Sequence, residues 1–109
     1  MTGPTTNLPW LTPWLLSTYH YRRENYAEAF PFIKEAFDKA QYCAGVHQYL
    51  LVNKYIELSA KTNKWKDFTR GIHWAGYLDI DVRWLRKEQP TKEKLEFVYE
   101  IMKRARYGD

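Results

Sequence analysis

This 109-residue chain has little of what disulfide-bonded, zinc-binding and membrane-spanning proteins need. Its single cysteine, Cys43, excludes an internal disulfide framework and a cysteine zinc site. Its longest apolar runs, 14–16 and 49–52, are far shorter than the ~20 residues that a membrane-spanning helix requires. Residues 1–6 carry no charged side chain ahead of the apolar stretch that follows, so we do not expect a secretory signal. We expect a cytoplasmic protein without a transmembrane segment.

The sequence also lacks the motifs of common catalytic and cofactor sites. It has no phosphate-binding glycine loop, no serine-nucleophile elbow and no HExxH or ExxH pair. Cys43 precedes His47 by four residues, but no third residue is present to orient such a pair. His73, Tyr77 and Asp81 would share one face of a continuous helix, where a hydrogen-bonded surface is favoured over a proton relay. We therefore expect no enzyme activity, no metal and no cofactor.

Aromatic residues are what the sequence has in excess. Trp, Tyr and Phe make up 17% of the chain, with 5, 9 and 5 copies. A chain of this length forms a single domain and buries only ~60–65% of the surface of its unfolded form. Most of these rings must therefore lie in the core, at an interface, or in both.

The spacing of apolar residues predicts an all-α fold. Apolar residues recur every three or four positions, and no segment shows the two-residue alternation of a half-buried strand. We predict an extended N-terminal arm over residues 1–12 and a single α-helical domain over residues 13–109. The domain should contain five to six helices in antiparallel αα-hairpins, arranged as a repeat-like stack or an irregular bundle. The predicted helices span 13–24, 26–42, 46–60 and 91–107, and 65–88 forms either one helix or two helices broken near 77–81.

Local signals support these boundaries and name the expected core. Thr12 followed by Pro13 is a good helix start, because threonine caps free amides and proline fits the first turn. Pro31 either kinks the second helix or marks its true first turn. The helical stripes predict that the following side chains are buried: Leu15, Leu16, Tyr19, Tyr26, Ala29, Ile33, Ala36, Phe37, Trp65, Phe68, Ile72, Ala75, Leu78, Val82, Leu85, Leu95, Val98, Met102 and Ala105. The stripe of the helix predicted over 46–60 holds Val46, Tyr49, Leu50, Asn53, Ile56, Glu57 and Ala60, with Val52 and Tyr55 on a neighbouring face.

The first predicted hairpin has a further pattern. A leucine and a small residue, Leu16 and Ser17, precede a turn at Tyr26 and two spaced alanines, Ala29 and Ala36. This arrangement resembles a tetratricopeptide hairpin over residues 13–42, with a poorer second copy over residues 46–79. The second copy departs from the family because Phe68 stands where alanine is expected. The resemblance implies a scaffold of stacked helices that binds peptides or proteins and is not a catalyst.

Six aromatic residues have no place on the predicted core stripes. These residues are Trp10, Trp14, Tyr21, Trp74, Trp84 and Tyr107. Because tryptophan and tyrosine are enriched at interface hot spots, we predict that these six bind a partner protein or a second copy of the chain. The arm that holds Trp10 docks either on its own domain or on a neighbouring subunit. The predicted function is a small non-catalytic interaction module or accessory subunit of a larger complex.

The distribution of charge supports an alternative function. The net charge of +4 lies in the C-terminal half, because residues 1–60 carry equal numbers of acidic and basic side chains. Cations accompany tryptophans over residues 61–106, where they would meet phosphates while exposed rings stack on bases. The alternative is therefore a small nucleic-acid-binding protein with a basic patch of Lys61, Lys64, Lys66, Arg70, Arg83, Arg86 and Lys87.

Overall fold

The computed structural model describes residues 8–40, 48–88 and 92–107. These residues form five α-helices and one short 3₁₀ helix, and none of them lies in a β-strand. The elements are α1 (Leu11–Arg22), α2 (Tyr26–Ala40), α3 (Gln48–Lys61), α4 (Trp65–Tyr77), η2 (Arg83–Glu88) and α5 (Lys92–Tyr107). The predicted all-α fold class is confirmed.

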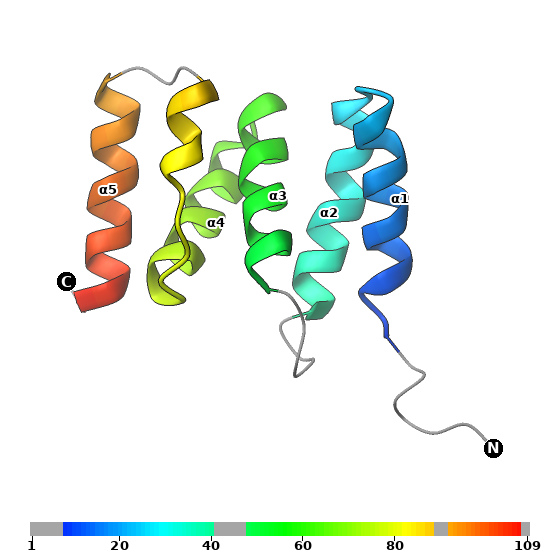
Figure 1. Cartoon of the computed structure of the whole chain (residues 1–109), viewed down its shortest axis with the longest axis horizontal. Helices are drawn as coiled ribbons and strands as arrows, with labels where there is room; N and C mark the ends of the chain where they lie inside the picture. The colour runs from blue at the N-terminus through cyan, green and yellow to red at the C-terminus, as the bar shows by residue number, and fades with distance from the viewer. Residues whose placement is uncertain (1–7, 41–47, 89–91, 108–109) are drawn as a thin grey trace.

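The helices stand side by side in a row, with α1 at one end and α5 at the other (Figure 1). Each helix packs against the next helix along the chain, from α1 on α2 to α4 on α5. Consecutive helices run antiparallel from α1 to α4, whereas α5 runs parallel to α4 because the chain returns along η2 between them (Figure 1). This is the predicted stack of hairpins, in which the two terminal helices each have one side that no helix of the described chain covers.

The same turn ends α1, α3 and α4. At each end a residue other than glycine takes the left-handed backbone conformation, and these residues are Glu24, Asn63 and Asp79, with φ of 60°, 59° and 59°. After α1, the Asn25 amide donates to the His20 carbonyl at 2.9 Å and the Glu24 amide donates to the Tyr21 carbonyl at 2.9 Å. The amides after α3 and α4 repeat both hydrogen bonds. This Schellman arrangement satisfies carbonyls that would otherwise be unpaired, and it stops each helix at a defined residue.

The segment 65–88 is broken, as one of its two predicted arrangements required. Helix α4 ends at Tyr77 and η2 begins at Arg83. The break is anchored by the Ile80 amide, which donates to the Ala75 carbonyl at 2.8 Å. Since Asp79 takes the left-handed conformation, the chain leaves the axis of α4 there, and the continuous-helix alternative is wrong.

Two prolines lie inside helices. Helix α1 begins at Leu11 with Trp10 as its N-cap residue, so the predicted cap at Thr12 is wrong. Pro13 still lies in the first turn, where its missing amide has no partner to lose. Pro31 lies inside α2, which begins at Tyr26, so the first-turn alternative for Pro31 is also wrong.

The core lies between α2, α3 and α4 and extends to η2 and α5. Its best-buried large side chain is Tyr55 of α3, whose ring stacks on Phe37 of α2 at 4.4 Å between centroids. The predicted stripes of α2 and α4 are confirmed at the following buried residues: Ala29, Ile33, Ala36, Phe37, Phe68, Ile72 and Ala75. Val82, Leu85 and Val98 are buried as well, Tyr26 and Leu78 are half-buried against this core, and the side chains of Leu95, Met102 and Ala105 lie outside the described part of the chain.

Six residues of the predicted stripes are not buried. Leu15, Leu16 and Tyr19 of α1 are 57%, 39% and 54% exposed, and Trp65 at the start of α4 is 40% exposed. Tyr49 and Leu50 of α3 are 55% and 44% exposed, because the side of α3 that faces the core is the neighbouring one, with Val52 and Tyr55. Apolar residues occur on nearly every side of α1, so its periodicity does not define which side faces the core. Trp65 is the first residue of α4 and lies beside the turn, where a position on the stripe no longer guarantees cover by a neighbouring helix.

Candidate interaction surface

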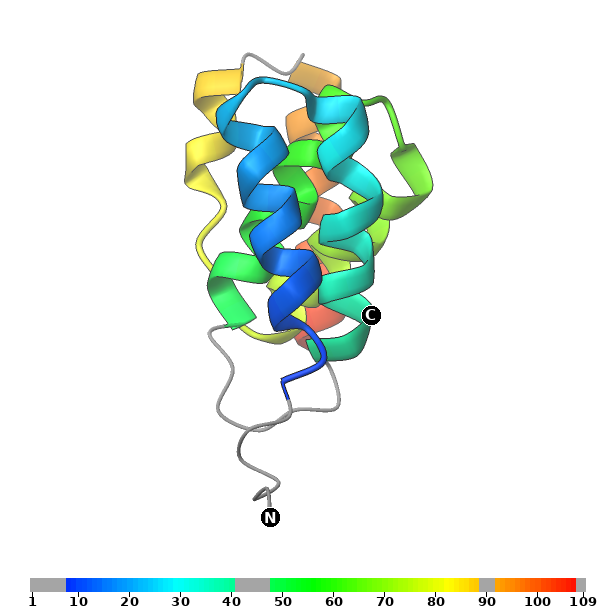
Figure 2. The ribbon, with the colours of Figure 1, turned by 90° about the vertical axis from the view of Figure 1, so that its right-hand side faces the viewer.

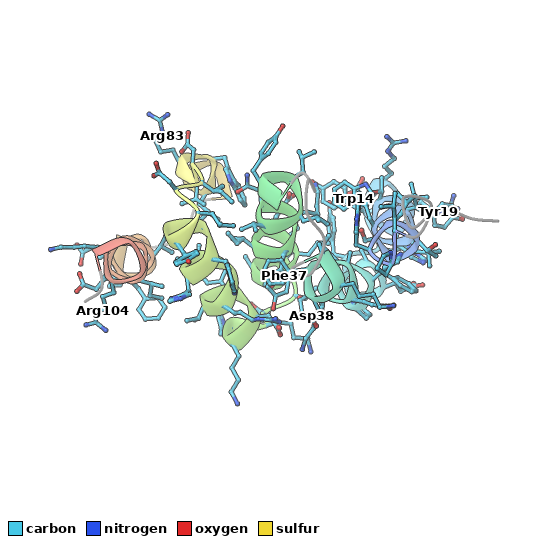
Figure 3. All side chains as sticks on the ribbon, turned by 90° about the horizontal axis from the view of Figure 1, so that it is seen from below. Trp14, Tyr19, Phe37, Asp38, Arg83 and Arg104 are labelled. Carbon is cyan, nitrogen blue, oxygen red and sulfur yellow. The ribbon has the colours of Figure 1, made fainter. Side chains whose placement is uncertain are left out.

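Helix α1 buries one side against the rest of the domain. Pro13 and Ser17 are buried on this inner side, and Trp10, Trp14 and Tyr21 are half-buried beside them. The Ser17 hydroxyl donates to the Trp14 carbonyl at 2.8 Å, so its polar group is satisfied within the helix. Figure 3 shows Trp14 on the inner side of α1 and Tyr19 on the opposite side.

Tyr21 connects α1 to α3. Its hydroxyl donates to Glu57 at 2.5 Å, and the ammonium of Lys54 lies 3.4 Å from the centre of its ring. The Tyr21 ring also meets the edge of Tyr26 at 5.6 Å between centroids. These contacts fix the rotation of α1 about its axis, and they thereby decide which side chains of α1 point outward.

The outward side of α1 is apolar. We define the outer face as Leu8, Leu11, Thr12, Leu15, Leu16 and Tyr19, of which only Leu11 is half-buried and the rest are exposed. Residues 8–19 contain no charged side chain. The nearest cation lies at the end of the face, where the Arg23 guanidinium lies 5.2 Å from the centre of the Tyr19 ring. Figure 2 views the molecule from this end, where α1 and α2 lie in front of the other helices.

Five of the six aromatic residues predicted to bind a partner pack against the core. Trp10, Trp14, Tyr21, Trp74 and Trp84 are half-buried in this way. Trp74 meets the edges of Phe37 at 6.5 Å and Tyr77 at 5.6 Å, and Trp84 donates from Nε1 to Asn53 at 2.9 Å. The side chain of Tyr107 lies outside the described part of the chain. A binding role for these six residues stays a prediction, and the structure assigns five of them a packing role.

The residues of the predicted basic patch lie in different surroundings. Lys61, Lys64 and Lys66 are exposed, and the Lys61 ammonium lies 5.0 Å from the ring centre of Tyr26. Arg70 forms an ion pair with Asp38 at 2.6 Å, and Arg83 forms one with Asp81 at 2.9 Å. The side chains of Arg86 and Lys87 are outside the described part of the chain. Nucleic-acid binding by this half of the chain stays a prediction.

Ion pairs connect α2 to α4 across α3. Lys34 of α2 lies 3.3 Å from Asp67 of α4, and Asp38 of α2 lies 2.6 Å from Arg70 of α4. Between them the Tyr55 hydroxyl of α3 donates to Asp67 at 2.5 Å. Figure 3 labels Phe37 and Asp38, which lie between α2 and its neighbours α3 and α4. Each of these charged groups has an oppositely charged partner, so we interpret the cluster as a structural connection between three helices.

Alkaline pH is expected to destabilise the fold through Tyr55. Burial of the Tyr55 hydroxyl, followed by its hydrogen bond to Asp67, raises its pKa above the usual 10.0. The folded chain therefore keeps a proton that the unfolded chain releases, so the stabilisation is complete below pH 10 and is lost as the pH rises above it. We expect the free energy of unfolding to fall by up to about 1.4 kcal/mol per pH unit there, and Tyr55→Phe to remove this component. Urea unfolding of the wild-type and Tyr55→Phe proteins at about pH 9 and about pH 11 measures this fall in the free energy of unfolding. An equal fall in the two proteins would contradict the assignment of the pH dependence to Tyr55.

The predicted catalytic alternatives are not assembled in the described residues. Helix α4 ends at Tyr77, so Asp81 does not share a helical face with His73. Asp81 is instead held by the Arg83 side chain and backbone amide, which lower the pKa of its carboxyl to about 2. Cys43 and His47 lie outside the described residues. Within the described residues, no group of three or more His, Cys, Asp and Glu side chains is arranged to hold a metal ion.

Sequence reasoning missed the outer face of α1, although a signal for it was present. The chain has no charged residue before Arg22, while it holds eight apolar residues between positions 8 and 21 besides the prolines. A 12-residue helix buries only one side against a single neighbour. An uncharged helix at the end of a stack therefore must leave apolar residues on its outside.

Comparison with known proteins gives no match from which a role could be transferred. The chain matches no model of a known protein family, no curated protein and no solved structure at a significant level. None of the helices in the described part of the chain combines the length and the apolar character that crossing a bilayer requires.

Proposed function

We propose that this chain is a small, non-catalytic interaction module that binds another protein through the outer face of α1. The carrying observation is that exposed leucine and tyrosine side chains cover the outside of a terminal helix without any charge among them. Terminal helices of helical stacks normally have a polar outer side, because that side faces water. An apolar outer side is typical of a helix that another helix covers.

The tetratricopeptide resemblance is consistent with this role. The two hairpins α1–α2 and α3–α4 use the same Schellman turn, with Glu24 and Asn63 in equivalent positions 39 residues apart. Ser17, Ala29 and Ala36 are buried, as the family pattern requires of the small residues on crossing helices. We propose a tetratricopeptide-like scaffold of about two hairpins, which is fewer than the three repeats that such stacks usually need for stability. A bound protein would cover the outer face of α1 in the place of a further repeat.

Leu15→Glu is expected to abolish partner capture without unfolding the chain. Leu15 is 57% exposed at the middle of the outer face, so a carboxylate there remains hydrated in the free chain but is buried in a complex. Affinity purification from lysate of the source organism, with quantitative mass spectrometry, compares the wild-type chain with this variant. Proteins bound through α1 should fall by more than about tenfold.

Leu50→Glu is the matched control. Leu50 lies on α3 and is 44% exposed, so the same substitution is made at a similar exposure away from α1. This control should retain the captured proteins. Equal recovery with Leu15→Glu and with wild type would refute the proposed surface.

A further inference from the structure

The central residues of the outer face have a spacing within α1 that is the same in both directions. Their central seam is Thr12 and Leu15, three residues apart, whereas Leu8 lies before the helix begins at Leu11 and Tyr19 therefore has no helical counterpart. Intervals of three and four are those that let one helix pack its side chains into another helix. Leu11 and Leu16 flank the seam at equal distances from its midpoint, which lies between residues 13 and 14.

A symmetric seam is complementary to its own copy. When two such helices are aligned antiparallel about the midpoint, Thr12 faces Leu15 of the second copy and Leu11 faces Leu16 of the second copy. A two-fold dimer needs this property, because each residue pair then occurs twice. We infer, on the basis of the proposed function, that the protein covering the outer face is a second copy of this chain, with the two α1 helices antiparallel.

The charges at the end of α1 favour the same orientation. Arg22 and Arg23 are exposed at the C-terminal end of the face, and no acidic residue precedes Glu24. A parallel dimer would bring four arginines together. The antiparallel dimer separates the two pairs by about 25 Å at ~1.5 Å per residue, which is well beyond the Debye length of about 8 Å. The two helix dipoles also oppose each other in this arrangement.

The size of the face predicts a weak, reversible dimer. A helix of 12 residues presents a strip roughly 18 Å long and 10 Å wide. This strip is smaller than the ~800 Å² per partner that standard interfaces bury. We therefore expect a dissociation constant in the micromolar range, so that the monomer and the dimer are both observable in one concentration series.

Sedimentation equilibrium of the full chain tests the dimer. From about 1 µM to about 500 µM, the wild-type mass should rise from that of one chain toward that of two chains. Leu15→Glu should raise the dissociation constant by more than about tenfold, because each dimer carries the substitution twice. Leu50→Glu should behave as wild type. Circular dichroism spectra and thermal unfolding confirm that both variants remain folded.

Cross-linking tests the antiparallel register. In a Cys43→Ala background, Thr12→Cys chains mixed with Leu15→Cys chains should form a disulfide-linked heterodimer under mild oxidation, identified by its mass. Each variant alone should cross-link poorly, because positions 12 and 15 face each other and not themselves. Homodimers from the separate variants would instead indicate a parallel pair and would overturn the proposal.

Three other outcomes also reject a second copy as the occupant. The first is a chain that stays monomeric throughout the concentration series. The second is a dimer whose dissociation constant is unchanged by Leu15→Glu. The third is a monomer that binds anionic phosphatidylglycerol vesicles in a manner that depends on Leu15. If the chain is monomeric but lysate proteins are still lost with Leu15→Glu, only this inference fails, and the proposed function stands.

Discussion

Tyr55→Ala is expected to lower the free energy of unfolding by about 3–5 kcal/mol, because this side chain fills the junction of three helices. Tyr55 is fully buried, and its ring stacks on Phe37 at 4.4 Å and lies 6.4 Å from the ring of Phe30. Truncation would leave a cavity where α2, α3 and α4 meet and would also remove the hydroxyl that donates to Asp67. Because small domains are stable by only about 5–15 kcal/mol, much of the total stability would be lost.

Urea unfolding followed by circular dichroism measures this effect, with Tyr55→Phe as the control. The phenylalanine variant keeps the ring contacts and loses the hydroxyl, which donates to Asp67 and accepts a longer hydrogen bond from Arg70, so we expect a cost of about 1.5–3 kcal/mol. If Tyr55→Ala and Tyr55→Phe destabilised the chain equally, the stacking of Tyr55 on Phe37 would contribute nothing, contrary to the packing described above.

Gly71→Val is expected to cost about 3 kcal/mol because α4 lies in close contact with α3 at this residue. A Cβ atom at Gly71 would lie 2.7 Å from Cγ1 of Ile56 and 3.3 Å from Cδ2 of Tyr55. Both neighbours are fully buried, so neither side chain has space into which it can move. Gly71→Ala should also destabilise, by about 1 kcal/mol, although alanine is the better helix former by about the same amount.

Lys66→Val is the control for the effect of valine itself on α4. Lys66 is exposed on the same helix, so the substitution there should cost less than about 0.7 kcal/mol. Thermal and urea unfolding of the three variants separate the two effects. A Gly71→Ala protein more stable than wild type would show that α3 and α4 are not in close contact at this position.

The sequence predicted the interior of the stack well where one side of a helix is clearly apolar. On α2 and α4, residues such as Ile33 and Ile72 recur at helical spacing among charged neighbours, so the periodicity identifies the buried side. The two hairpin turns were also located correctly. Their boundaries are defined locally, by residues such as Glu24 and Asn63 that take the left-handed conformation after the helix.

The sequence did not predict which side of α1 faces the core. Trp10, Trp14, Leu15 and Tyr19 are all apolar, and they occur on opposite sides of the helix. The choice depends on tertiary contacts of Tyr21 with Glu57 and Lys54, which lie more than 30 residues away and leave no periodic signal. The predicted and observed sides were therefore exchanged.

Helical periodicity also did not predict that most of the candidate binding residues pack against the core. Residues off the simple stripes, such as Trp74 and Trp84, were expected to be available to a partner. The break at Asp79 turns the chain, and η2 then reaches α3, where Trp84 finds Asn53 as a hydrogen-bond acceptor. Periodicity assumes a straight helix, so it does not describe contacts made after such a break. The exposed apolar surface lies instead on α1.

Methyl NMR of the leucines on dilution tests most directly whether the chain associates through the outer face of α1. The spectrum would be recorded from about 1 mM to about 20 µM, a range that spans a micromolar dissociation constant. Association through this face predicts concentration-dependent shifts for Leu8, Leu11, Leu15 and Leu16, and constant shifts for Leu50 of α3. Shifts at Leu50 with constant positions for the four leucines of the outer face would contradict it.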